Sequence, residues 1–190
     1  MRVGFLVFDD VEELDFVGPL EVFGITSTLT GKVEVVTVSK DGGLVKCRYG
    51  LKVQPDHSFR KCPSLDLLVV PGGRGAREFA MHNSRVLSFI RTQATKAHIA
   101  SVCTGALVLA EAGLLRGHKA TTHHALCERL EGYPDIIVLR NARYVREENV
   151  SSSAGISAGI DLALAIVREK FGNKIVREVV KDMEYTKGQI

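Results

Sequence analysis

The stretch His98-Ile-Ala-Ser-Val-Cys-Thr-Gly-Ala-Leu-Val-Leu-Ala-Glu-Ala112 joins an apolar run to a helix-forming run at a single cysteine. Residues 99–102 are typical of a short buried strand, and the Ala and Leu content of residues 106–112 predicts a helix that packs back over it. Cys103, Thr104 and Gly105 form the turn between the two, and Gly105 permits close approach of the helix to the sheet. The stretch therefore predicts a cysteine nucleophile elbow in an α/β fold.

Cys103 allows a structural and a catalytic interpretation. Free cysteine is among the most buried residue types and commonly acts as a small hydrophobe. A structural cysteine, however, needs no junction between a strand and a helix, and at such a junction the positive end of the helix dipole favours thiolate over thiol. Because thiolate is the nucleophilic form of cysteine, we favour an active site centred on Cys103.

The composition is that of one ordinary globular domain over residues 1–190. Hydrophobic residues make up 45% of the chain and charged residues 25%, which are values typical of a soluble protein. A chain of 190 residues is long enough to bury about 70% of its unfolded surface around a single core. No internal repeat or low-complexity tract suggests a second unit.

Charge and cysteine spacing argue against several classes of protein. The net charge of +3 comes from dispersed Lys and Arg without a basic run, so we expect no nucleic-acid partner. Acidic residues interrupt the longest apolar tracts, so we expect no membrane span. The cysteines form no CxxC pair and follow no cleavable apolar leader, which indicates a reducing cytoplasm. Without a zinc spacing or a nucleotide-binding glycine pattern, we expect neither a metal nor a cofactor.

An acidic segment follows the first predicted strand. Residues 2–8 are typical of a parallel strand buried on both faces, and Pro19 is placed to open a helix that ends near residues 24–27. Because proline disfavours α geometry in the residue before it, we expect Asp15 in a loop among apolar neighbours. Desolvation there would disfavour the charged form of its carboxyl, so Asp15 is a candidate general acid. The alternative is a loop carboxylate that caps nearby N–H groups.

A glycine pair follows another predicted strand. Residues 65–70 run into Pro71, Gly72 and Gly73, where no side chains shield the backbone N–H groups. Such donors suit an oxyanion, so Gly72 and Gly73 are candidate oxyanion or substrate-binding residues. His123 ends a short predicted strand at 120–122 and could reach the sulfur, which makes it a further candidate for substrate binding.

Strands that alternate with helices predict a doubly wound, mostly parallel α/β sheet, a flavodoxin-like three-layer sandwich. A turn at residues 41–43 predicts an antiparallel hairpin that extends this sheet. Ser151 to Ser153 are expected to cap a long helix over residues 155–171, with a last helix over 175–183. Ligands of such folds bind at the carboxyl ends of the strands, so Asp15, the glycine pair and Cys103 are expected to converge at one rim.

These segments resemble the ThiJ/PfpI superfamily, which has the fold of class I glutamine amidotransferases. The resemblance runs from Val3 to about Met183 and is closest to the isonitrile hydratase branch and to the amidotransferase-like half of AraC-type regulators. Both branches carry aspartate in a D-x-x-G-P context and Cys-Thr-Gly at the elbow. The motifs are Leu14-Asp-Phe-Val-Gly-Pro19, Val70-Pro-Gly-Gly73, Val102-Cys-Thr-Gly-Ala106, Gly113-Leu-Leu-Arg-Gly117, Ala120-Thr-Thr-His123 and Ser153-Ala-Gly-Ile-Ser-Ala-Gly-Ile-Asp161.

The resemblance implies that Cys103 is the nucleophile, that Asp15 acts on proton and water transfers, and that Thr104 contributes its N–H and hydroxyl. It also implies that Gly73 is a backbone donor facing the elbow and that the chain forms a homodimer. The peptidase-like branch has His directly after its cysteine, where this chain has Thr104, so peptidase activity is not expected. Most members carry Glu at the position of Asp15, and the shorter acid favours hydration.

We therefore expect a cysteine-dependent hydratase or hydrolase of small carbon–nitrogen compounds, similar to isonitrile hydratase, with Cys103 thiolate as nucleophile and Asp15 as general acid. Two alternatives stay open. One is hydrolysis or aldehyde chemistry on small carbonyls, of the amidase and glyoxalase kind. The other is a ligand- or redox-sensing module related to AraC-type regulators, in which Cys103 binds or oxidises without turnover.

Overall fold

The structure, a computed structural model, describes residues 1–186 and is organised around a seven-stranded sheet in the order β10-β11-β7-β6-β1-β2-β5. Neighbouring strands run parallel, except that β10 and β11 are antiparallel. The predicted mostly parallel α/β sheet is confirmed. The strands are β1 (Arg2–Leu6), β2 (Glu34–Ser39), β5 (His57–Ser58), β6 (Leu67–Val70), β7 (His98–Val102), β10 (Tyr144–Arg146) and β11 (Val150–Ser153).

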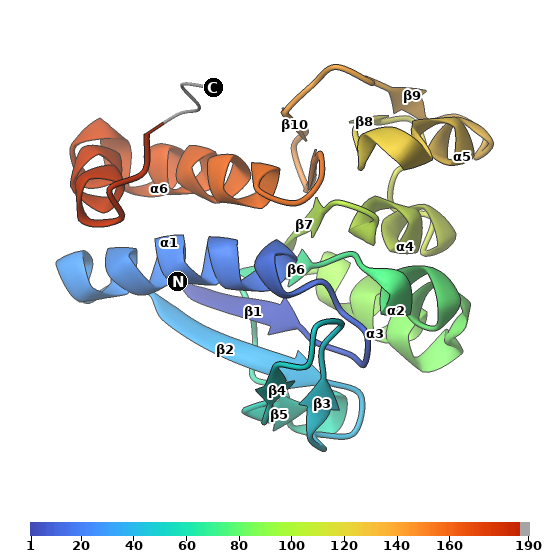
Figure 1. Cartoon of the computed structure of the whole chain (residues 1–190), viewed down its shortest axis with the longest axis horizontal. Helices are drawn as coiled ribbons and strands as arrows, with labels where there is room; N and C mark the ends of the chain where they lie inside the picture. Colours follow the sequence, from blue (N-terminus) through green and yellow to red (C-terminus); the bar gives the residue numbers. More distant parts are fainter. Residues whose placement is uncertain (187–190) are drawn as a thin grey trace.

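Helices cover the sheet on both sides, which gives the three layers of a flavodoxin-like fold (Figure 1). The long helices α1 (Glu13–Thr30) and α6 (Ala158–Asp182) lie side by side on one side. The shorter helices α2 (Arg74–Glu78), α3 (Ser84–Ala94) and α4 (Gly105–Glu111) gather on the other. Because the central strands are covered on both faces, β6 and β11 are buried at every residue.

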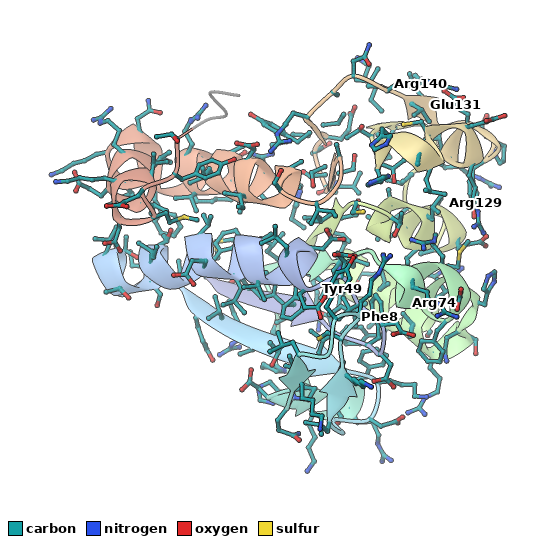
Figure 2. All side chains as sticks on the ribbon, in the orientation of Figure 1. Phe8, Tyr49, Arg74, Arg129, Glu131 and Arg140 are labelled. Carbon is teal, nitrogen blue, oxygen red and sulfur yellow. The ribbon has the colours of Figure 1, made fainter. Side chains whose placement is uncertain are left out.

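A small outer unit follows α4. Strands β8 (Lys119–Ala120) and β9 (Ile137–Val138) form a two-stranded parallel sheet beside α5 (Cys127–Glu131). Arg140 and Glu131 form an ion pair at the outer edge of this unit, with Nε of Arg140 2.7 Å from Oε1 of Glu131 (Figure 2). The unit brings residues 120–123 back to the elbow at the end of β7, because Thr121 and Thr122 hydrogen-bond to β11 and to Cys103.

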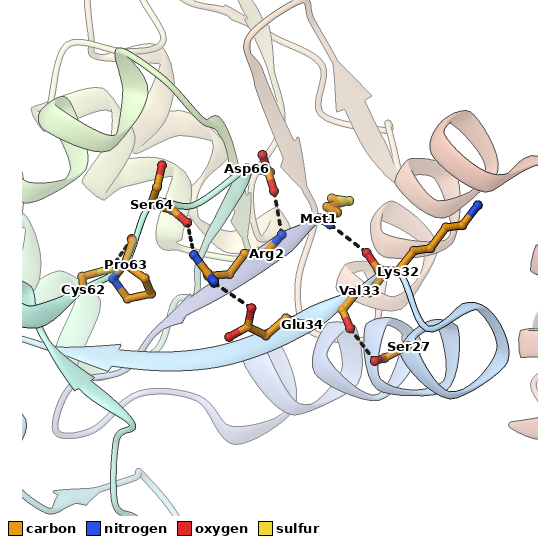
Figure 3. A network of polar contacts seen from close by, with 10 residues as sticks. All are labelled: Met1, Arg2, Ser27, Lys32, Val33, Glu34, Cys62, Pro63, Ser64 and Asp66. Carbon is orange, nitrogen blue, oxygen red and sulfur yellow. Dashed lines mark hydrogen bonds and ion pairs between the residues drawn. The ribbon is translucent and has the colours of Figure 1, made fainter.

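Polar contacts hold the amino-terminal ends of the strands in register (Figure 3). The backbone N–H of Arg2 donates to the Asp66 carboxylate at 2.6 Å, and its guanidinium pairs with Glu34 at 2.8 Å. These bonds tie β1 to the start of β6 and of β2 at the edge opposite the elbow. The candidate site therefore lies at the other, carboxyl-terminal edge of the sheet.

Helix α1 begins before its predicted start and contains Pro19 in its interior. The prediction of a loop around Asp15 is wrong, because Asp15 lies in the first turn of this helix. A proline inside a helix costs about 3 kcal/mol. Burial of the apolar face offsets that cost: Phe16 and Val22 are buried, and Gly18 packs against Ile160 of α6.

Two further expectations need correction. The hairpin does not extend the central sheet, because β3 (Val45–Lys46) and β4 (Lys52–Val53) pair as a separate two-stranded sheet whose reversal falls at residues 47–51. Ser151 to Ser153 form strand β11 instead of a helix cap. The two helices predicted at the end of the chain are confirmed, because α6 consists of two helical segments separated by a kink at Gly172, where φ is 82°.

Among residues 1–186, no helix combines the length and the apolarity needed to cross a membrane.

Candidate active site

The elbow at Cys103 has the backbone geometry that a strand-to-helix nucleophile turn requires. Cys103 follows β7, and its φ of 56° is left-handed. For a non-glycine residue this conformation costs about 1–2 kcal/mol, so surrounding contacts must hold it. Helix α4 then passes so close to β6 that a Cβ at Gly105 would lie 2.1 Å from the Val70 carbonyl oxygen. The close approach expected at Gly105 is confirmed.

Three partners fix the peptide groups on both sides of Cys103. Its N–H donates to the carbonyl oxygens of Ser153 at 3.2 Å and Ala154 at 3.3 Å, at the end of β11. Its own carbonyl oxygen accepts a 2.8 Å hydrogen bond from the hydroxyl of Thr122. The elbow is therefore clamped from two segments that are distant in sequence.

Asp15 projects from the first turn of α1 toward the elbow and is fully buried. Its Oδ2 accepts a 2.9 Å hydrogen bond from the N–H of Gly72. Its other oxygen, Oδ1, is buried and has no partner of ordinary hydrogen-bond geometry among the described residues. The Cys103 thiol nevertheless lies close enough to lower the pKa of this carboxyl. The Asp15 carboxyl is therefore a buried neighbour of the Cys103 thiol.

The glycine segment after β6 is hydrogen-bonded to Asp15 and to Thr104, the two residues that flank the Cys103 sulfur. The Thr104 hydroxyl accepts from the Gly73 N–H at 3.0 Å and donates to the Gly73 carbonyl at 3.3 Å. The Gly72 N–H is already bonded to Asp15. An oxyanion role for Gly72 or Gly73, which stays a prediction, would require these bonds to open. In this structure the two residues position Asp15 and Thr104.

The segment before α1 is paired to the same glycines. Val11 forms an antiparallel bridge with Gly73, and the N–H of Glu12 donates to the Gly72 carbonyl at 3.1 Å. The backbone is so close that a Cβ at Gly73, whose φ is 112°, would lie 2.5 Å from the Glu12 nitrogen. Three chain segments that follow β1, β6 and β7 therefore converge at one rim, as expected from the parallel sheet.

Burial sets the protonation of Asp15. Desolvation raises the pKa of its carboxyl from 3.8 to about 7, with a smaller contribution from the nearby Glu12 carboxylate. The hydrogen bonds from Gly72 and Cys103 offset only part of this effect. At neutral pH the carboxyl is therefore divided between its acid and base forms, which suits a group that must both accept and donate a proton.

The thiol of Cys103 differs from the sequence-based expectation of a resting thiolate. Burial raises its pKa, the Asp15 charge raises it further, and the Thr104 N–H lowers it only in part. A helix dipole is worth about 0.3–1 kcal/mol, which corresponds to less than one pKa unit, whereas full burial shifts a pKa by about 3–5 units. The effect of desolvation on the Cys103 pKa is therefore larger than that of the helix dipole, and the sulfur is a thiol before the reaction.

Glu12 and Arg48 add a charged pair beside Asp15 that sequence analysis did not identify. The Glu12 side chain is buried, and its Oε2 lies 3.1 Å from Nη1 of the partly exposed Arg48. The neighbouring Tyr49 is one of the most exposed aromatic side chains, and the Arg48 guanidinium lies 5.3 Å from its ring centre (Figure 2). No motif in the sequence connects residue 12 to residue 48, because their contact depends on the β3–β4 turn.

His123 lies at the edge of this arrangement. Its ring packs on Gly155, where a Cβ would lie 2.2 Å from Cδ2 of the imidazole, and its Nδ1 accepts from the Ala125 N–H at 3.3 Å. Burial, His124 and Arg77 lower its pKa, so the ring is neutral at neutral pH. Within the described chain, its imidazole makes no hydrogen bond to the Cys103 sulfur, and a substrate-binding role stays a prediction. Thr122, the residue before it, makes the contact with the elbow.

A doubly wound sheet with a cysteine at a strand-to-helix elbow defines a class of α/β proteins whose cysteine lies at the carboxyl ends of the strands. The DJ-1/PfpI family is of this class, its family model matches residues 1–169, and the chain belongs to it. The resemblance seen in the sequence motifs is confirmed.

Two relatives illustrate the range of the family. Isonitrile hydratase from Pseudomonas putida is 40% identical over 186 residues, which are 97% of this chain and 78% of that protein. The HTH-type transcriptional regulator GbdR from Pseudomonas aeruginosa is 27% identical over 91% of this chain and 47% of the regulator.

Solved structures agree on the fold. A ThiJ/PfpI family protein from Pseudomonas syringae superimposes with a TM-score of 0.90 at 33% identity, covering 100% of this chain and 77% of its own. Drosophila melanogaster DJ-1beta has a TM-score of 0.86 at 24% identity over 98% of each chain, which shows a shared fold. The predicted homodimer is a property of an assembly and stays a prediction.

Proposed function

We propose that this protein is a cysteine-dependent hydratase of small carbon–nitrogen compounds, with isonitriles as its substrate class. One observation carries the proposal: the buried carboxyl of Asp15 interacts with the thiol of Cys103 and has one oxygen with no other hydrogen-bond partner among the described residues. The 40% identity with a protein named isonitrile hydratase supports the choice of substrate class. Hydration of R–NC yields the N-formamide R–NH–CHO.

In the first step the pair adds sulfur and hydrogen across the isonitrile carbon. Asp15, as carboxylate, accepts the thiol proton of Cys103 while the sulfur bonds to the terminal carbon. The proton then passes from Asp15 to that carbon, which gives the thioimidate R–N=CH–S and returns Asp15 to its base form. Because the sulfur rests as a thiol, Asp15 acts first as a base and then as the general acid.

In the second step water releases the product. Asp15 accepts a proton from water as the oxygen attacks the thioimidate carbon, and that proton is delivered to nitrogen. The C–S bond then breaks, the hydroxyl proton returns to sulfur and the N-formamide leaves. A carboxyl whose pKa is about 7 can serve both transfers near neutral pH.

The test is the rate of N-formamide formation from cyclohexyl isonitrile. We expect turnover by wild type, none by Cys103→Ala, and a loss of about 100-fold or more in Asp15→Asn, which is typical when a general acid–base group is removed. Cys62→Ala is the matched control, since this thiol lies at the opposite edge of the sheet beside Pro63, and its rate should equal wild type. Equal rates in all four proteins would remove Cys103 and Asp15 from the mechanism.

Assays with methylglyoxal and a simple amide, run beside the isonitrile assay, distinguish isonitrile hydration from the amidase or glyoxalase alternative, because each substrate gives a different product.

The regulator relative supports a sensing module as the second candidate. Reversible oxidation favours exposed cysteines of low pKa, whereas Cys103 is buried with a raised pKa. A sensor would bind a ligand at the site without turning over any of the three compounds.

A further inference from the structure

Beyond the nucleophile and its acid, we propose that Thr122 is a positioning residue that holds the Cys103 elbow in its reactive conformation. The inference rests on the proposed function only in taking Cys103 as the reacting group. Its evidence is the geometry of the elbow, where the Thr122 hydroxyl donates to the carbonyl oxygen of Cys103 at 2.8 Å.

Thr122 supplies the shorter of the two hydrogen bonds that this carbonyl accepts. The other comes from the N–H of Ala106, in the first turn of α4, at 3.4 Å. Thr122 is fully buried, so water cannot replace its hydroxyl. Without that hydroxyl the carbonyl would keep only the long contact from Ala106, and a buried acceptor would lose its main partner.

Rotation of this peptide group would move the sulfur. The N–H of Cys103 is held by the carbonyl oxygens of Ser153 and Ala154, and the hydrogen bond from Thr122 holds its carbonyl group. The left-handed φ of 56° is strained, so a freed carbonyl lets the residue relax toward an ordinary conformation. Such a relaxation would turn the thiol away from the Asp15 carboxyl, with which it interacts in this structure. Thr122 thus acts on the reacting pair through the backbone.

The adjacent threonine provides a matched control. Thr121 is also fully buried, and its hydroxyl donates to a backbone carbonyl, that of Ala142, at 3.2 Å. Its partner belongs to the outer unit, and no contact of its side chain reaches the elbow in the part of the chain described. Replacing either threonine by valine removes one buried hydroxyl and keeps the side-chain shape. Only Thr122→Val removes a bond to Cys103.

The experiment measures, at a series of pH values, the rate at which iodoacetamide alkylates Cys103. Mass spectrometry of the peptide that contains Cys103 follows the reaction. In this reaction the sulfur displaces iodide and loses its proton, and no enzyme substrate is needed. We expect Thr122→Val to slow alkylation about 10-fold, because small displacements of reacting groups cost one to two orders of magnitude. Thr122→Ser should retain the wild-type rate within about twofold, since it keeps the hydroxyl donor. Thr121→Val should leave rate and pH profile unchanged.

Two results would overturn the proposal: an unchanged rate in Thr122→Val, or an equal loss in Thr121→Val, which would show a general effect of destabilisation. Should Thr122→Val not fold, Thr122→Ala is the second apolar variant and carries the same expectation. The outcome is independent of the substrate. If Thr122 controls alkylation while wild type forms no N-formamide, the proposed function fails and the positioning role stands.

Discussion

At the scale of single residues, burial of the Asp15 carboxyl lowers the stability of the fold at neutral pH and brings the pKa of this group into the range that proton transfer needs. A carboxyl with no exposed surface and a pKa near 7 is costly to ionise, and among residues 1–186 a single hydrogen bond of ordinary geometry, from Gly72, stabilises its charge. Functional residues commonly carry such a cost, because a proton must be available at working pH. The same burial holds the neighbouring Cys103 as a thiol.

Asp15→Asn should therefore stabilise the protein at alkaline pH. The pKa rises from 3.8 in the unfolded chain to about 7 in the fold, so the folded state binds the proton more tightly. Stability from this group is complete below pH 4 and is lost as pH rises toward about 7, with a cost of about 2–4 kcal/mol above it. Thermal unfolding should give a higher Tm for Asp15→Asn at pH 8 and no such gain at pH 4. A gain that is equal at both values would show that ionisation of Asp15 is not the cause.

Cys103 shows what residue types alone could predict. Its place at the turn between an apolar run and a helix-forming run identified the elbow, and the structure places it there. Its protonation could not be predicted, because that depends on how deeply the sulfur is buried and on an acid from another segment. Thr122 was missed for a similar reason, since its partner lies 19 positions away in the chain.

At the scale of elements, the glycine segment after β6 connects α1 to the elbow. A Cβ at Gly72 would lie 2.5 Å from both the nitrogen and Oγ1 of Thr104 and 2.9 Å from Oδ2 of Asp15. These neighbours are a backbone atom and two buried side chains, and the side chains are hydrogen-bonded to Gly72 and Gly73. The segment can therefore carry no side chain at this position without shifting the reacting pair.

Gly72→Ala should destabilise the fold by about 1–3 kcal/mol, as overpacking does, and should lower N-formamide formation well below wild type. The control is Gly43→Ala, because a Cβ there meets no atom within 4 Å. An exposed substitution of that kind changes stability by less than about 0.5 kcal/mol. Urea unfolding and the formamide assay measure the two effects. A Gly72→Ala protein as active as Gly43→Ala would contradict the packing described for this rim.

The start of helix α1 could not be predicted correctly from local sequence rules. Pro19 signals a helix start by its local geometry, and that signal was followed in placing Asp15 in a loop. The helix runs through Pro19 because Gly18 and Pro19 pack against Ile160 and Gly159 of α6. Such packing joins segments that are far apart in sequence, so a local rule could not reveal it. The strands, in contrast, were predicted well, because burial on both faces leaves apolar runs that are visible in the sequence.

At the scale of the whole molecule, the parallel sheet brings together the groups that we propose to react. The segments after β1, β6 and β7 carry Asp15, Gly72 and Cys103, and parallel strands place all three at one rim. This convergence followed from the alternation of strands and helices. The charged pair of Glu12 and Arg48 did not, because the β3–β4 sheet was expected to join the central sheet and instead folds over the rim.

In the proposed mechanism, the buried Asp15 carboxyl exchanges a proton with the Cys103 thiol near neutral pH. Carbon-13 NMR of the aspartate carboxyl groups tests it most directly, with the Asp15 signal assigned by its absence in Asp15→Asn. We expect this signal to titrate with a midpoint of about 7. A midpoint near the ordinary aspartate value of 3.8 would show a solvated carboxylate and would rule out the proposed proton exchange.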